Sequence, residues 1–221
     1  MTIKFISLNQ KFVEIAKMYG LDASCMDIRD YKVERKTYFV SPANSLGFMD
    51  GGYDLALSRD VMPGIERNVK KKIAEVGRTN LLGRKYLPIG SYIILDSDDP
   101  LKKLVVSPTM LLPQDVSNTN NAYYSALFAL EGITTYDKDD SKYDIILTSL
   151  CCGYGKMDEE KSVLQIFRAI QHYKLPSKFQ FARHWGGKWD YSICEPNLSE
   201  QPKIYQNTEW FNIDSSEVKN I

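Results

Sequence analysis

The residues best suited to chemistry in this sequence gather in a polar loop at positions 41–54, directly after the apolar segment 38–40. Asn44 and Asp54 stand ten residues apart in it, and Gly51 and Gly52 lie between them. An amide, a carboxylate and glycines that let the backbone approach a ligand suit a site for a polar small molecule. The alternative is a surface loop in which Asn and Asp only satisfy turns.

A second glycine loop follows the apolar run 143–150 and reads Cys151, Cys152, Gly153, Tyr154, Gly155. We expect a helix to begin directly after it, and the free N–H groups at a helix N-terminus suit a phosphate. The chain has neither a GxGxxG nor a GxxxxGK[ST] motif, which excludes a Rossmann dinucleotide fingerprint and a triphosphate P-loop. The two loops are instead placed to hold the two sides of a diphosphate.

The chemistry of Asp27 is less specific. Asp27 lies near the end of a strand predicted over residues 24–28. A carboxylate there could accept a hydrogen bond from an adenine amino group. The competing interpretation is a helix N-cap or turn residue, with Asp30 close by.

Strands that alternate with helices must position these loops. The patterns predict strands at 3–8, 24–28, 37–41, 92–96, 104–107 and 143–150, the last of them central, and helices near 12–19, 63–76, 122–130 and 158–170. Such alternation indicates a mixed or largely parallel sheet with helices on both faces. Residues 1–176 form one predicted domain. Residues 177–221 carry all three tryptophans and are predicted to be an extension packed on it, with a binding lip as the alternative.

Composition narrows the class of partner. The 28 basic and 28 acidic residues balance, which argues against nucleic acid or a membrane as the main partner. No apolar run approaches the ~20 residues of a membrane helix, and the N-terminus lacks the pattern of a signal peptide. The four cysteines lack metal-like spacing, which predicts reduced thiols in a cytoplasmic protein, with a nuclear one as the alternative. His172 and His184 are isolated, so we expect no metal and no cofactor; His172 is predicted to be a surface or cap residue.

Four segments in this order resemble the macrodomain family: Asp27-Ile28, residues 40–45, Gly51 to Asp54, and the loop 151–155. The resemblance covers roughly residues 1–175 and implies a three-layer α/β/α sandwich with a mixed, largely parallel central sheet that binds ADP-ribose. It implies that Asp27 and Ile28 meet adenine and that Asn44 meets the distal ribose. It also implies that Gly51, Gly52 and Tyr53 line the diphosphate and distal ribose, and that the phosphates are wrapped by Cys152, Gly153, Tyr154 and Gly155.

Departures from the family pattern bear on activity. Met26, Ser41, Pro42 and Asp50 replace usual residues, and the compact late loop resembles the branch that removes phosphate from ADP-ribose 1″-phosphate. Gly155 stands where the branch that cleaves ADP-ribosyl-glutamate esters has an aspartate, which disfavours that lysine-aspartate mechanism.

The expected function is hydrolysis at C1″ of the distal ribose, with ADP-ribose 1″-phosphate or an ADP-ribosylated protein as substrate and a monomeric protein as catalyst. Asn44 would orient the ribose or a water molecule, and Asp54 would act as general base. A nucleophilic Cys151 or Cys152 is disfavoured because no histidine partner is recognisable. Two alternatives remain, a reader module that binds ADP-ribose without turnover and a scaffold whose tryptophan-rich tail binds a partner.

Overall fold

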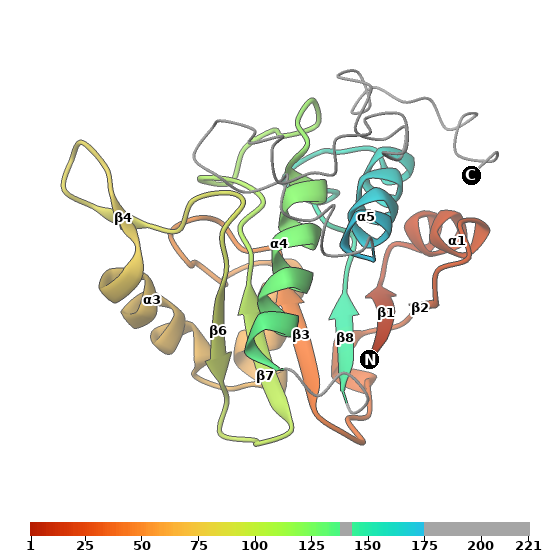
Figure 1. The fold of residues 1–221 in the computed structure, drawn as a ribbon, viewed down its shortest axis with the longest axis horizontal. Coiled ribbons are helices and arrows are strands. Elements are labelled where there is room, and N and C mark those ends of the chain that lie inside the picture. The colour runs from red at the N-terminus through yellow and green to blue at the C-terminus, as the bar shows by residue number, and fades with distance from the viewer. Residues whose placement is uncertain (138–142, 175–221) are drawn as a thin grey trace, which may run out of the picture.

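The computed structural model describes residues 1–137 and 143–174, which are the coloured parts of Figure 1. The predicted extension 177–221, with its three tryptophans and His184, lies outside the described residues. The division into a domain and an extension therefore stays a prediction. Within the described part of the chain, no helix combines the length and the apolar character needed to cross a membrane.

A six-stranded sheet forms the centre of the fold. Its strands, in spatial order, are β2 (Ala23–Cys25), β1 (Thr2–Ser7), β8 (Asp144–Leu147), β3 (Thr37–Ser41), β7 (Lys102–Val106) and β6 (Ile93–Asp96). All neighbours are parallel except β6 and β7, which are antiparallel. The prediction of a mixed, largely parallel sheet is confirmed. Every residue of β3 and β8 is buried, as expected for central strands covered on both sides.

Helices cover both faces of this sheet and complete three layers (Figure 1). One face packs against α1 (Gln10–Met18), α4 (Asn121–Tyr136) and α5 (Glu159–Tyr173). The other packs against the short helices η1 (Ile28–Asp30), α2 (Gly52–Ala56) and η2 (Leu57–Val61), and against α3 (Ile65–Val76). Buried Ala122, Ala126 and Ala129 have small side chains that let α4 approach the sheet closely. A two-stranded hairpin, β4 (Arg78–Thr79) and β5 (Lys85–Tyr86), projects beyond α3 and was not predicted.

Several predicted boundaries are wrong. The strand predicted over 143–150 ends at Leu147, because the backbone turns and the Leu150 N–H donates to the Thr148 carbonyl. The helix predicted to start at Pro63 starts at Ile65, after Gly64 with its positive φ of 80°.

His172 is neither a surface nor a cap residue. It is buried between α5 and α4, where its Nδ1 shares a hydrogen bond with the Tyr123 hydroxyl.

Candidate functional site

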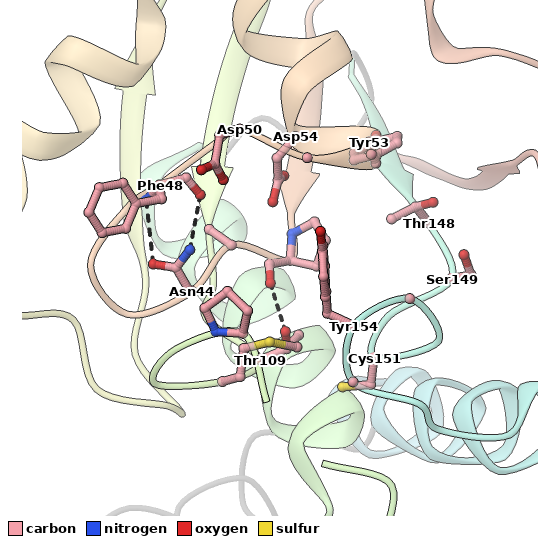
Figure 2. Close-up of a pocket in the computed structure, with 18 of the residues that line it drawn as sticks. Asn44, Phe48, Asp50, Tyr53, Asp54, Thr109, Thr148, Ser149, Cys151 and Tyr154 are labelled. Carbon is pink, nitrogen blue, oxygen red and sulfur yellow. Dashed lines mark hydrogen bonds between the residues drawn. The ribbon is translucent and has the colours of Figure 1, made fainter. Parts of the chain in front are cut away.

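A cleft of about 570 Å³ opens where β3, β7 and β8 end. The carboxyl ends of parallel strands meet at one edge of a sheet, and ligands of open α/β sheets bind there. The segments that line it are residues 42–44, 48 and 50–54 after β3, residues 109, 110 and 113 after β7, and residues 148, 149, 151 and 153–156 after β8. Two loops that lie about a hundred residues apart in the sequence therefore face one cavity (Figure 2).

Asn44 lines the cleft, but its side chain mainly ties its own loop together. Its Oδ1 accepts hydrogen bonds from the N–H groups of Leu46 at 3.0 Å and Phe48 at 3.4 Å, and its Nδ2 donates to the Phe48 carbonyl at 3.1 Å. Figure 2 shows the two hydrogen bonds between Asn44 and Phe48. One Nδ2 hydrogen is left for a ligand, since a primary amide has two donors. The predicted contact of Asn44 with ribose hydroxyls is limited to that donor as long as these hydrogen bonds remain.

Asp54 is the most perturbed acid of the site. It lies in the first turn of α2, and its Oδ1 accepts a 2.7 Å hydrogen bond from the Ser41 hydroxyl at the end of β3. Burial raises the pKa of Asp54 from 3.8 to about 7; the Ser41 hydrogen bond opposes this shift, and the charge of Asp50 adds to it. A carboxyl group with a pKa near neutrality can exchange a proton with a substrate or water.

Tyr53 and Asp50 flank Asp54. The Tyr53 hydroxyl is buried and has no hydrogen-bond partner among the described residues, and burial raises its pKa. Asp50 is exposed and lines the cleft close to Asp54, as Figure 2 shows. The sequence interpretation treated Asp50 only as a departure from a glycine pattern and did not assign it to the site.

The loop 151–156 is a turn that lines the cleft opposite the loop 41–54. Cys151 adopts a positive φ of 66°, and its carbonyl accepts the Met157 N–H at 3.0 Å. A Cβ on Gly155 would lie 2.4 Å from the Cys151 carbonyl oxygen, so glycine is required there. The ring of Tyr154 is 74% exposed and lies over Gly51, where a Cβ would be 3.5 Å from Tyr154 Cε2. Gly51, Tyr154 and Gly155 all line the cleft, and their contact with a ligand stays a prediction.

The N-terminus of α5 lies within one residue of the predicted start at 158, but it does not follow the loop 151–155 directly. Helix α5 begins at Glu159, and the Asp158 side chain caps it by accepting the Glu160 N–H. Lys11 forms salt bridges with Asp158 at 3.1 Å and Glu159 at 2.7 Å. The free N–H groups that we expected to meet a phosphate are therefore partly occupied, and two carboxylates stand beside them. This part of the sequence prediction is wrong.

Burial disfavours the thiolate form of both cysteines of the loop. Burial raises the pKa of the Cys151 thiol to about 12 and that of the Cys152 thiol to about 11. The thiolate is the nucleophilic form, so both groups are poor nucleophiles near neutral pH. Cys151 lines the cleft and Cys152 does not, since the Cys152 thiol donates to the Leu150 carbonyl instead.

Asp27 and Ile28 do not line this cleft. Asp27 is the N-cap of η1, with its Oδ1 accepting the Arg29 N–H, and its carboxylate forms a salt bridge with the Arg29 guanidinium. That partnership lowers the pKa of Asp27 to about 2. The N-cap interpretation left open by the sequence is thus seen directly. Contact with adenine stays a prediction for both residues.

Further lining residues were missed by sequence reasoning, namely Thr109 and Met110 after β7, Thr148 and Ser149 after β8, and Lys156. Thr109 and Met110 lie just beyond a predicted strand end, whereas Thr148 and Ser149 were placed inside the strand predicted over 143–150, which ends at Leu147. Lys156 has a positive φ of 53° and is 72% exposed, with its Nζ 3.8 Å from an Asp115 carboxylate oxygen. It is the only Lys or Arg among the lining residues. Within the part of the chain described, no three His, Cys, Asp or Glu side chains are grouped to hold a metal ion.

Comparisons with known proteins agree with this architecture. Residues 5–182 match the family described as the Macro-like domain. Among solved structures, the macrodomain of Mycobacterium tuberculosis DarG is similar with a TM-score of 0.51 and 18% identity, over 67% of this chain and 88% of that one. The likeness shows a shared fold and confirms the predicted α/β sandwich.

Two further structures are less similar. One is a mutant of the Oceanobacillus iheyensis macrodomain with ADP-ribose, at a TM-score of 0.49 and 18% identity over 66% of this chain and 73% of that one. The other is Thermosipho africanus DarTG in complex with ADP-ribose, at a TM-score of 0.46 and 15% identity over 64% of this chain and 36% of that one. The search of curated proteins found no match.

Proposed function

The chain belongs to the family of Macro-like domains, and from that membership we propose that its cleft binds ADP-ribose and hydrolyses a bond at C1″ of the distal ribose. The bond is either the phosphate ester of ADP-ribose 1″-phosphate or the link between ADP-ribose and a protein side chain. The compact loop 151–155 supports the first substrate by its likeness to the phosphatase-like branch. The protein is proposed to be a monomer, and residues 1–176 are proposed to form the one domain that binds the ligand.

The cleft supports a definite orientation of the ligand. Its volume of about 570 Å³ lies in the usual range for small-molecule sites. The diphosphate is proposed to lie along the backbone of Gly153 to Gly155, where Lys156 adds a positive charge. The distal ribose then lies between Gly51 and Asn44, with the Tyr154 ring against it. Asp27 and Ile28 stay proposed as adenine contacts, and Asp27 would have to share its carboxylate with Arg29.

The observation that carries the hydrolytic proposal is the partly buried carboxyl group of Asp54, hydrogen-bonded to Ser41 at the cleft. In the proposed reaction a water oxygen forms a bond to C1″ while the bond from C1″ to the leaving oxygen breaks. Asp54 takes the proton of that water and can return it to the leaving oxygen. A positioned base of this kind contributes roughly 10²–10⁴-fold to the rate. Positioning by the glycine loops adds to it.

One observation favours a second function, that of a reader that binds without turnover. The Asn44 amide is engaged with Leu46 and Phe48, which leaves it little capacity to orient a water molecule. A cleft that only binds needs no such water.

A turnover assay separates the two functions. The protein is incubated with ADP-ribose 1″-phosphate and, in parallel, with an ADP-ribosylated protein, and released phosphate and ADP-ribose are quantified. Turnover of either substrate that is lost in Asp54→Asn supports the hydrolase. Saturable binding of ADP-ribose with no turnover of either substrate supports the reader and rejects the hydrolase.

A further inference from the structure

The charges of the cleft are divided between its two sides. Asp50 and Asp54 stand together on the side formed by the first loop. Lys156, the one basic residue among the lining residues, belongs to the loop after β8. An anionic group is therefore favoured near Lys156 and disfavoured near the two carboxylates.

No basic side chain in the described part of the chain neutralises the charge of Asp50. No salt bridge joins it to a Lys or Arg among the described residues. Lys70 comes near this side, with its Nζ 4.7 Å from the centroid of the Phe48 ring, but it pairs with Glu66 at 2.6 Å. The Asp50 carboxylate is exposed and faces the cleft beside Asp54 (Figure 2). It is thus available to act on whatever group enters there.

This arrangement, taken together with the proposed function on which it rests, leads to a specificity role. We propose that Asp50 is a specificity determinant that excludes an anionic group from C1″ of the distal ribose. The acceptor attached at C1″ is then uncharged or cationic, and a terminal phosphate is the disfavoured substituent. This preference is opposite to the one that the phosphatase-like pattern of the loop 151–155 suggests. That loop forms the other side of the cleft.

The size of the effect follows from Coulomb's law. A phosphate monoester carries about 1.5 to 2 negative charges at neutral pH. At about 5 Å from a carboxylate that is exposed to solvent, and with the dielectric constant of bulk water, the repulsion is enough to weaken binding roughly tenfold. The backbone N–H groups of Gly51 and Gly52 give no compensating full charge. Salt should reduce the effect, because the site is open to solvent.

The experiment is a pair of calorimetric titrations with ADP-ribose and with ADP-ribose 1″-phosphate, carried out on the wild type, Asp50→Asn, Asp50→Gly and Asp98→Asn. Asp98 is an exposed acid in the turn between β6 and β7, at the opposite end of the sheet, and serves as the matched control. After each titration, chromatography of the solution in the calorimeter detects any turnover of the ligand. The wild type is expected to bind ADP-ribose about tenfold more tightly than the 1″-phosphate. Asp50→Asn should reduce that ratio about tenfold, while Asp98→Asn keeps the wild-type ratio.

Three results overturn the inference. The first is a wild type that binds the 1″-phosphate as tightly as ADP-ribose, or more tightly. The second is a ratio that Asp50→Asn and Asp50→Gly both leave unchanged. In these two cases the proposed function stands, since both ligands bind. The third is a wild type that binds neither ligand, which rejects the proposed function and the inference with it.

Discussion

The Ser41 hydroxyl donates a hydrogen bond of 2.7 Å to Asp54 Oδ1 and so joins the last residue of β3 to the first turn of α2. The same hydroxyl accepts the Ala43 N–H at 3.3 Å, which fixes its direction. Ser41 itself is fully buried. The carboxyl group of Asp54 is thus held by the sheet and faces a cleft whose other wall is a glycine loop.

Asp54→Asn should separate binding from catalysis. The amide keeps the shape of the side chain and can still accept from Ser41, so the Kd for ADP-ribose should change by less than about threefold. Turnover of the preferred substrate should fall by roughly 10²–10⁴-fold, because the amide cannot take a proton from water. Calorimetry gives the Kd, and chromatography of the products gives the rate. An Asp54→Asn protein that turns over its substrate at the wild-type rate would exclude Asp54 as the base.

The pH dependence of turnover should report the pKa of Asp54. A general base works in its deprotonated form, so kcat/KM should rise with pH and level off above the Asp54 pKa of about 7. Ser41→Ala removes a hydrogen bond that lowers this pKa and should move the rising limb to higher pH. If the rising limb does not shift in Ser41→Ala, a group other than Asp54 causes the pH dependence.

The raised pKa of Asp54 also makes the free energy of unfolding depend on pH. Because its pKa is raised on folding from 3.8 to about 7, the folded state binds more protons than the unfolded state between these values. The contribution of Asp54 to the free energy of unfolding therefore falls as pH rises through this window. Thermal unfolding should show that Asp54→Asn gains stability relative to the wild type between pH ~4 and ~7.

The sequence was sufficient for the fold and for part of the site, for different physical reasons. Strand β3 was predicted to its exact bounds because a run of buried residues ends at Ser41-Pro42. The cleft loops could be located because glycines and polar residues follow strand ends. The partners of individual side chains could not, because the Ser41–Asp54 and Asp27–Arg29 contacts depend on local geometry. The burial of His172 has the same origin.

Gly155 should be far less tolerant of substitution than Gly153. An alanine at Gly155 would place its Cβ 2.4 Å from the Cys151 carbonyl oxygen and 2.7 Å from Val116 Cγ2. We expect Gly155→Ala to cost about 1–3 kcal/mol of stability and to weaken ADP-ribose binding, since the loop must move. Gly153→Ala is the matched control, because its Cβ would meet no atom within 4 Å, and its stability should change by less than ~0.5 kcal/mol. Equal denaturation midpoints for the two variants would contradict the described loop.

The loop cysteines should be inert towards alkylation in the folded protein. Burial raises the pKa of Cys151 to about 12 and of Cys152 to about 11, whereas Cys25 is exposed. After iodoacetamide treatment at pH 7.5, mass spectrometry should find Cys25 modified well before Cys151 or Cys152. Cys152→Ala should retain turnover. If a folded Cys152→Ala protein lost turnover, that result would support a cysteine nucleophile.

The most direct measurement of the central claim is a calorimetric titration of the protein with ADP-ribose, alongside Gly51→Phe and Leu81→Ser. Gly51 has an extended backbone that any residue can adopt, and a side chain there would point at Tyr154 across the cleft. Leu81 is fully exposed on the distant hairpin and serves as the control. The wild type and Leu81→Ser should bind one ADP-ribose with saturable heat, and Gly51→Phe should not. No heat from the wild type, or unchanged binding by Gly51→Phe, would contradict an ADP-ribose site in this cleft.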